Sequence, residues 1–265
     1  FLKKTKPTLV VDAAAKVGGI GANNAFPVEF LSDNVRIQSN LMESAHAADV
    51  EKFIFLGSSC IYPRDCAQPI KEEYLMTGPL EETNSAYAIA KIAGIELIKS
   101  FRKEYGRTWI SLMPTNLYGP NDNFELQGSH VLPAFIRRFV EATQSNVATE
   151  TLWGTGSPKR EFLHVDDLAA AVVHLGGSYN SSNHLNIGSG EDLTIKELAE
   201  LVAELAGFKG EIAWDSTKPD GTPRKVLDVS KAKSLGWAPK ISLRDGIAST
   251  IAWYKDASAK GVARR

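Results

Sequence analysis

The sequence predicts an α/β protein with a Rossmann-type, doubly wound parallel sheet and a smaller α/β substrate domain. Two observations support this class. Short apolar runs alternate with longer amphipathic stretches through the first half of the chain, which indicates repeated strand–helix units. The runs, such as Phe53–Leu56, show no polar alternation, as is typical of strands buried on both faces. A chain of 265 residues, 43% of them hydrophobic, is long enough for one large or two small domains.

The first half predicts the parallel sheet, element by element. Each apolar run is four to six residues long, and each intervening stretch has an apolar face with helical periodicity. Helices that join successive strands place those strands parallel, with helices on both faces of the sheet. We therefore expect strands at residues 7–12, 53–56 and 109–114, and helices at residues 34–48 and 85–105.

Loop residues become frequent from about residue 121, and the second half predicts the smaller domain. Thr194 and Glu197 form a capping-box pattern at the start of one helix, and we expect Asp166 or Asp167 to cap the helix that starts at Leu168. The predicted helices cover residues 131–141, 168–175, 194–205 and 243–257, and the predicted strands residues 151–154 and 183–187. The expected division is a dinucleotide-binding domain over residues 1–122, completed by about 158–176 and 217–230, with residues 123–265 mostly binding substrate.

Charge and cysteine content exclude several classes of protein. Thirty basic and 31 acidic residues nearly cancel, so nothing indicates a nucleic acid or an anionic membrane as partner. No apolar run approaches the roughly 18 residues that cross a bilayer, and the start of the chain does not resemble a secretory signal. Cys60 and Cys66 are too few for a disulfide framework, and with no further ligands nearby they predict no metal site. We expect a cytoplasmic protein.

Ser58, Tyr87 and Lys91 predict the reduction of a ketone. Ser58 follows a buried strand, and Tyr87 and Lys91 share one helix face at i and i+4. The serine can bind the substrate oxygen, the tyrosine can pass it a proton, and the lysine charge is expected to lower the pKa of the tyrosine. A Tyr-x-x-x-Lys pattern alone is weak and also fits a surface pair. The strand that ends in Ser58 favours the catalytic interpretation, because open α/β sheets bind ligands at the carboxyl ends of their strands.

Reduction also needs a nicotinamide cofactor, because these three side chains supply no hydride. The one glycine-rich candidate, Gly18–Gly21, follows a strand, but residues 22–27 do not predict a helix, so we reject it as a pyrophosphate loop. Two interpretations stay open. Either the protein is a cofactor-deficient scaffold, or the chain as given begins after its first two strand–helix units. We favour the second.

Several longer motifs together identify a family. They are residues 13–20, 55–63, 87–94, 113–120, 129–131, 160–167 and 220–225. On these segments the chain resembles the extended short-chain dehydrogenase/reductases that act on nucleotide sugars. The resemblance implies NADP(H), a GDP-sugar substrate with a 4-keto group, epimerisation at C3 and C5, reduction at C4, and a homodimer formed by the helices at 34–48 and 85–105. It also implies about 50 residues before Phe1. Another nucleotide-sugar epimerase or reductase on the same scaffold is the alternative.

The resemblance also implies roles for individual residues. Cys60 and His130 match the acid/base pair for epimerisation, and Cys60 lies two residues after Ser58, on the same side of an extended strand end. The alternatives are purely structural roles: Cys60 as a buried thiol packed in the core, and His130 as a loop or helix-cap residue. Residues matching cofactor contacts are Ala14, Leu56, Ser58, Ser59, Lys91, Asn116, Leu117 and His130. Residues matching substrate contacts are Arg138, Trp153, Arg160, Asp220 and Lys225, although Arg138 equally fits a solvated helix face.

Overall fold

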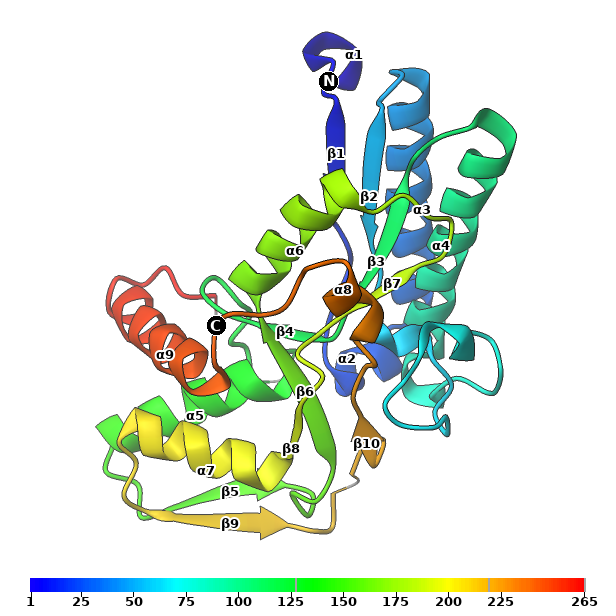
Figure 1. Cartoon of the computed structure of the whole chain (residues 1–265). Coiled ribbons are helices and arrows are strands. Elements are labelled where there is room, and N and C mark those ends of the chain that lie inside the picture. The colour runs from blue at the N-terminus through cyan, green and yellow to red at the C-terminus, as the bar shows by residue number, and fades with distance from the viewer. Residues whose placement is uncertain (127, 219, 265) are drawn as a thin grey trace.

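The computed structural model describes residues 1–126, 128–218 and 220–264 (Figure 1). The parts of the predicted loops and of the second predicted domain that fall on residues 127, 219 and 265 lie outside this description.

A four-stranded parallel sheet forms the upper part of the molecule in Figure 1. Its strands are β1 (Leu9–Asp12), β2 (Lys52–Leu56), β3 (Ile110–Pro114) and β7 (Leu185–Ile187), in that spatial order, and every neighbouring pair is parallel. The carboxyl ends of all four strands therefore meet at one edge. The predicted Rossmann-type sheet is confirmed.

Helices cover both faces of this sheet, as the doubly wound prediction requires. On one face, α3 (Pro27–Ala47) and α4 (Ser85–Tyr105) lie side by side and pack on Phe53 and Phe55. On the other face, α6 (Val165–Ser178) and α8 (Ser230–Ser234) pack around Ile54. Successive residues of β2 thus point to opposite faces, and both faces are dry, which explains the unbroken apolar run in the sequence.

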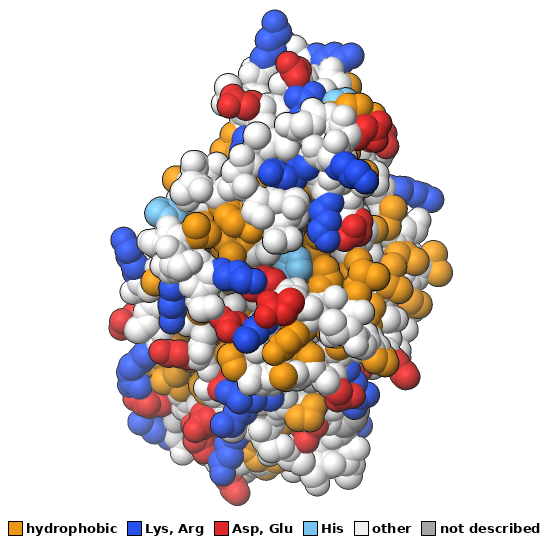
Figure 2. Space-filling model, turned by 45° about the vertical axis from the view of Figure 1, so that its right-hand side comes forward, with side chains coloured by type: hydrophobic (Ala, Val, Ile, Leu, Met, Phe, Trp, Pro, Cys, Tyr) orange, Lys and Arg blue, Asp and Glu red, His pale blue; other side chains and the backbone are white. Residues whose placement is uncertain are grey.

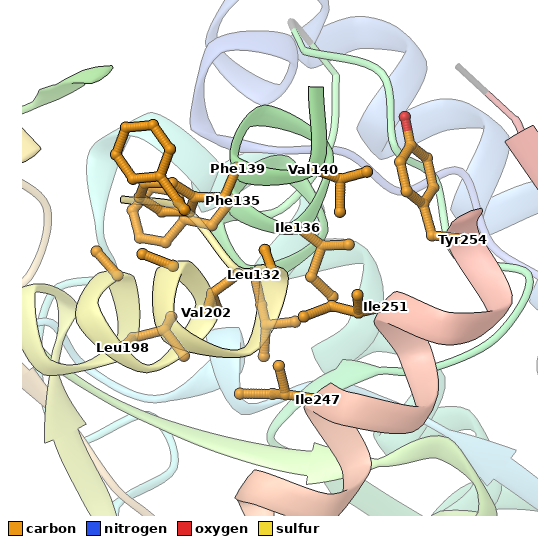
Figure 3. Close-up of a cluster of buried hydrophobic side chains, with 14 of the residues drawn as sticks. Leu132, Phe135, Ile136, Phe139, Val140, Leu198, Val202, Ile247, Ile251 and Tyr254 are labelled. Atoms are coloured by element: carbon orange, nitrogen blue, oxygen red, sulfur yellow. The ribbon is translucent and has the colours of Figure 1, made fainter. Parts of the chain in front are cut away.

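The lower part of the molecule is built from three helices and short strands. Figure 3 shows apolar side chains of α5 (Val131–Gln144), α7 (Ile195–Ala206) and α9 (Leu243–Ala259) pointing toward one another in one cluster. The strands here are β4 (Asn116–Tyr118), β5 (Thr149–Trp153), β6 (Lys159–His164), β8 (Asp192–Thr194), β9 (Glu211–Asp215) and β10 (Arg224–Lys225). They form a sheet β10-β6-β4, with β8 antiparallel to β6, and a separate parallel pair β5-β9. The division into domains at residue 122 stays a prediction.

The N-terminal third differs most from the sequence prediction. Residues 22–27 are not expected to be helical, but the short helix α2 covers Ile20–Ala25, and α3 begins at Pro27 rather than at Asn34. Proline fits the first turn of a helix because its missing N–H would have no partner there. The remaining short helices are α1 (Leu2–Thr5), η1 (Ser59–Ile61), η2 (Glu72–Tyr74) and η3 (Glu82–Asn84).

The predicted aspartate cap of α6 is also wrong. The helix begins at Val165, three residues earlier than predicted, and the ring of His164 accepts the capping hydrogen bond from the N–H of Asp166. Asp167 is buried and accepts hydrogen bonds from the N–H groups of Lys240 and Ile241, at 2.9 and 3.0 Å. Its carboxylate therefore fastens α6 to the segment that precedes α9. The capping box of Thr194 and Glu197 is confirmed.

A glycine allows α4 to lie close to β2. A Cβ added at Gly94 would lie 2.4 Å from the ring of Phe55. We expect Gly94→Ala to lower the free energy of unfolding by about 1–3 kcal/mol, because an overpacked contact displaces the ring or the helix. Urea denaturation followed by circular dichroism measures this change.

Gly177→Ala in α6 is the matched control for this substitution. No atom lies within 4 Å of a Cβ at Gly177, so the same exchange there is expected to be neutral or to stabilise the protein by up to about 1 kcal/mol. Equal effects of the two substitutions would contradict a close α4–β2 contact.

Candidate active site

The end of β2 places Ser58 and Cys60 at the edge where the parallel strands finish. The chain leaves β2 at Leu56 and turns through η1, where the Oγ of Ser58 accepts a hydrogen bond from the N–H of Cys60 at 3.2 Å. The extended backbone of Ser58 and the tight turn after it hold both side chains near one another. Ser59, between them, is buried.

Tyr87 and Lys91 lie on the face of α4 that is turned toward this edge. The ammonium of Lys91 is 6.0 Å from the centroid of the Tyr87 ring, and it donates a hydrogen bond of 2.9 Å to the carbonyl oxygen of Leu56. Lys91 is only 3% exposed, so it is not the surface residue of a chance pair. Burial lowers the pKa of Lys91 to about 8.

Asp12 is a residue that the sequence analysis did not assign to the site. It ends β1, is 2% exposed, and accepts a hydrogen bond from the N–H of Ala14 at 3.1 Å, while its other oxygen has no partner among the described residues. Burial raises the pKa of Asp12, and the charge of Lys91 opposes that rise. In return, Asp12 opposes the loss of the Lys91 proton. A lone aspartate at a strand end gives no sequence signal for such an electrostatic interaction.

The pKa of Tyr87 differs from expectation. Burial raises it, and the negative charge of a nearby Cys60 thiolate raises it further, whereas a hydrogen bond with Ser58 lowers it. The predicted lowering by Lys91 is therefore not present in this structure, because the ammonium is turned to the carbonyl of Leu56. The contacts do bring Ser58, Cys60 and Tyr87 together.

Cys60 lies among polar groups from distant parts of the chain. The ammonium of Lys225 on β10 is 3.4 Å from its sulfur, and the amide of Asn84, just before α4, is 3.7 Å away. Burial raises the pKa of the Cys60 thiol, but the charge of Lys225, hydrogen bonds from Ser58 and Lys225, and the charge of Arg160 outweigh it, so the pKa is lowered overall. The two cysteines are free thiols.

His130 stands at the start of α5 and is positioned by a loop contact. The N–H of Gly19 donates to the carbonyl oxygen of Gly128, and a Cβ at Gly19 would lie 2.9 Å from the carbonyl oxygen of Ser129. Only glycine fits this approach, so the glycines at 18–19 support the segment before His130. Desolvation and the charge of Lys225 both lower the pKa of His130.

The predicted substrate residues fall into two groups. Arg160 is the register neighbour of Lys225 across β6 and β10, and its charge acts on Cys60 and on Asp220. These residues therefore lie near the catalytic group. Asp220 also accepts hydrogen bonds from the N–H and hydroxyl of Thr155, at 3.0 and 2.7 Å.

Arg138 and Trp153 lie further along the smaller part. Arg138 forms an ion pair with Glu150 on β5, and Trp153, which ends β5, is 72% exposed with the ammonium of Lys218 at 5.7 Å from its ring. No contact between described residues joins either of them to Cys60 or Tyr87, so their substrate roles stay predictions.

The predicted cofactor residues follow the carboxyl ends of the first sheet. Ala14 follows β1, Leu56 ends β2, and Asn116 and Leu117 begin β4, directly after β3. The amide of Asn116 donates to the backbone carbonyl of Glu161 at 2.8 Å, so it also joins β4 to β6. Within the described ranges, no group of three or more His, Cys, Asp or Glu side chains is arranged to hold a metal ion. No helix there is both long and apolar enough to cross a membrane.

Comparison with known proteins agrees with these features. The sequence matches the model of the NAD dependent epimerase/dehydratase family over residues 1–188. It is 58% identical over 254 residues to GDP-L-fucose synthase 1 of Arabidopsis thaliana, covering 96% of this chain and 79% of that protein. It is 53% identical over 251 residues to GDP-L-fucose synthase of Escherichia coli K12, covering 91% and 78%.

Solved structures give the same answer. The crystal structure of a GDP-L-fucose synthetase from Naegleria fowleri bound to NADP has a TM-score of 0.90 and 28% sequence identity, over 100% of this chain and 81% of that chain. The resemblance inferred from the motifs is confirmed. The chain belongs to the NAD dependent epimerase/dehydratase family.

Proposed function

We propose that this chain converts GDP-4-keto-6-deoxy-D-mannose to GDP-L-fucose with NADPH, by epimerisation at C3 and C5 and reduction at C4. Its relatives from Arabidopsis thaliana and Escherichia coli are named for the synthesis of this product. The observation that carries the proposal is the position of Cys60, a candidate acid/base group. It lies beside Ser58 and Tyr87, the side chains that bind and protonate the ketone oxygen during reduction. A simple reductase needs no proton-transfer group of this kind.

Epimerisation uses the acidity of the C–H bonds on either side of the 4-keto group. A base removes the proton, the bonding electrons move toward the ketone oxygen, and a proton returns to the carbon from the opposite face. Cys60 and His130 are the proposed pair. Ser58 and Tyr87 hydrogen-bond the ketone oxygen and so stabilise the negative charge that develops on it.

Reduction at C4 then uses Tyr87 as the proton donor. Its raised pKa keeps the hydroxyl protonated until the alkoxide forms. In the resting structure the ammonium of Lys91 donates to the carbonyl oxygen of Leu56, 6.0 Å from the centroid of the Tyr87 ring, and we propose that it turns to the phenolate only once Tyr87 has given up its proton. Bound NADPH supplies the hydride to C4.

The strand ends fit a nicotinamide cofactor. The stretch after β1 carries only small side chains at residues 13–15, which allows close approach of a ligand, and the unpartnered oxygen of Asp12 is a buried acceptor beside it. Ser59 lies in η1 after β2, Asn116 and Leu117 lie on β4 directly after β3, and Lys91 lies on α4. This is the edge at which open α/β sheets bind dinucleotides. NADP is bound in the Naegleria fowleri structure.

The proposed GDP-sugar lies between the two parts of the chain. Arg160 and Lys225 supply positive charge for a diphosphate, and Trp153 offers an exposed ring on which a base or sugar can stack. We also propose the cytoplasm as location, since the two cysteines are free thiols.

A homodimer through α3 and α4 is the proposed assembly. Val28, Leu31 and Ile89 on these helices are 76%, 37% and 49% exposed. Figure 2 shows apolar side chains gathered on the side of the molecule where α3 and α4 lie. Sedimentation at several protein concentrations tests this assembly, and a monomer at every concentration would contradict it.

The activity itself is tested with the purified protein, GDP-4-keto-6-deoxy-D-mannose and NADPH in deuterated water. We expect oxidation of NADPH together with a product that carries deuterium at C3 and C5. Reduction without deuterium at these carbons would favour the alternative of a simple nucleotide-sugar reductase. The absence of both reactions would favour a scaffold.

A further inference from the structure

Lys225 has an unusual partner for a lysine. Its ammonium is half-buried on β10, and among the described residues it forms no ion pair with a carboxylate within 4.0 Å. The contact that it does make is with the sulfur of Cys60, at 3.4 Å. An ammonium that has lost part of its hydration shell is stabilised by an anion, and the group placed to be that anion is the thiolate.

The surroundings of Cys60 favour the same charge state. Lys225 and Arg160 are register neighbours on adjacent parallel strands, so two cations from one sheet act on the same sulfur. The amide of Asn84 points its donor at the sulfur, at 3.7 Å. Acidic groups nearby are already paired, since Glu81 forms an ion pair with Arg64 at 3.5 Å.

We propose that Lys225 is a positioning residue that holds Cys60 as a thiolate before the substrate binds. Cys60 then starts the epimerisation as the base. Its sulfur takes the proton from the C–H bond next to the ketone, an S–H bond forms, and the electron pair of the broken C–H bond moves into the enolate, whose charge rests on the ketone oxygen. This step deepens the proposed function and rests on it, whereas the thiolate itself exists without any substrate.

The groups that face Cys60 determine its titration. They are Ser58 from the end of β2, Tyr87 and Asn84 from α4 and the turn before it, Arg160 from β6, and Lys225 from β10, with Arg64, Glu81 and Arg224 lining the same small pocket. Of these, Lys225 and Arg160 favour the thiolate by charge, and burial opposes it. Removing Lys225 removes the charge that is in direct contact with the sulfur.

The test is the pH dependence of Cys60 alkylation by iodoacetamide, in a Cys66→Ser background and with no substrate or cofactor present. We expect the native lysine to give a midpoint below that of an ordinary thiol, near 8.5. Lys225→Met is expected to raise this midpoint by about one pH unit or more, which slows alkylation at neutral pH about tenfold. Lys225→Arg is expected to retain the low midpoint.

Arg224→Met is the matched control. Arg224 precedes Lys225 on β10 and carries the same charge, but its guanidinium is paired with Asp192 at 2.5 Å. We expect this substitution to leave the midpoint unchanged. An unchanged midpoint in Lys225→Met, or an equal shift in Arg224→Met, would overturn the proposal. Far-ultraviolet absorbance of the thiolate gives the same titration without requiring reagent access, and circular dichroism verifies folding.

The substrate reaction separates this role from simple phosphate binding. If Lys225 only binds the diphosphate, Lys225→Met raises KM but does not change the pH below which the rate of deuterium exchange declines. If Lys225 holds the thiolate, Lys225→Met shifts this decline in the exchange rate to higher pH, together with the midpoint of alkylation. A chain that shows the predicted titration but no epimerisation would leave the thiolate in place and contradict only the proposed reaction.

Discussion

Lys91→Met is expected to lower NADPH-dependent reduction by about 100-fold or more while the protein stays folded. Methionine fills a similar space but removes the charge that stabilises the Tyr87 phenolate in the transition state, and such proton-transfer assistance is typically worth about 10²–10⁴-fold. Because burial lowers the pKa of Lys91 to about 8, we also expect native reduction to decline as pH rises above about 8, where the ammonium loses its proton. Steady-state oxidation of NADPH from about pH 6 to about pH 10 measures both effects.

Lys99→Met provides the control for this experiment. Lys99 lies on the same helix but pairs with Glu96 at the surface, at 2.6 Å, so its removal is expected to leave turnover within about twofold. Near-native turnover of Lys91→Met would mean that the lysine has only a structural role, through its hydrogen bond to the carbonyl oxygen of Leu56. Circular dichroism and thermal unfolding distinguish a lost proton-transfer function from a lost fold.

Tyr87→Phe and Cys60→Ala are expected to separate the two halves of the reaction. Tyr87→Phe removes the proton donor for C4, so reduction is expected to fall by about 10²–10⁴-fold while C3 and C5 still exchange with solvent deuterium. Cys60→Ala removes the proposed base, so exchange is expected to fall by a similar factor. Reduction of the ketone that has not been epimerised is retained in part, because Ser58, Tyr87 and Lys91 remain.

Deuterium incorporation measured by NMR, alongside consumption of NADPH, follows both activities in one sample. Cys66→Ala is the control, since Cys66 lies outside the catalytic group and is expected to change neither activity. If Cys60→Ala exchanges both carbons at the native rate, Cys60 has no catalytic role and is only a packed thiol. The epimerase proposal would then depend on His130 alone.

Local patterns explain why much of the fold and the reducing group could be predicted. The buried runs of β2 and β3 and the helical face of α4 are each visible within about 20 residues, and they place Ser58, Tyr87 and Lys91 without further information. The start of α3 is not predicted because Phe26, just before the helix, and Val28, in its first turn, are apolar but exposed, which obscures the apolar face. Strands such as β8 and β10 are too short to show any periodicity.

Contacts across the sequence explain what could not be predicted. Nothing near Cys60 in the chain indicates that Lys225 lies 3.4 Å from its sulfur, or that the amide of Asn84 donates to the same atom. Asn84 forms no capping hydrogen bond with α4, so it is available to the thiol. The effect of the Asp12 charge on Lys91 likewise depends on β1 and α4 meeting at one end of the sheet.

The return of β10 to the end of β2 has a consequence for how the protein is made. Cys60 and Lys225 are 165 residues apart, and Leu227 and Val229 complete the apolar cluster that Phe53 and Phe55 begin. At about 5–20 residues per second, a ribosome needs on the order of ten seconds or more to synthesise the intervening chain. During that interval part of the β2 core stays open, so the nascent chain is exposed to aggregation until Leu227 and Val229 emerge.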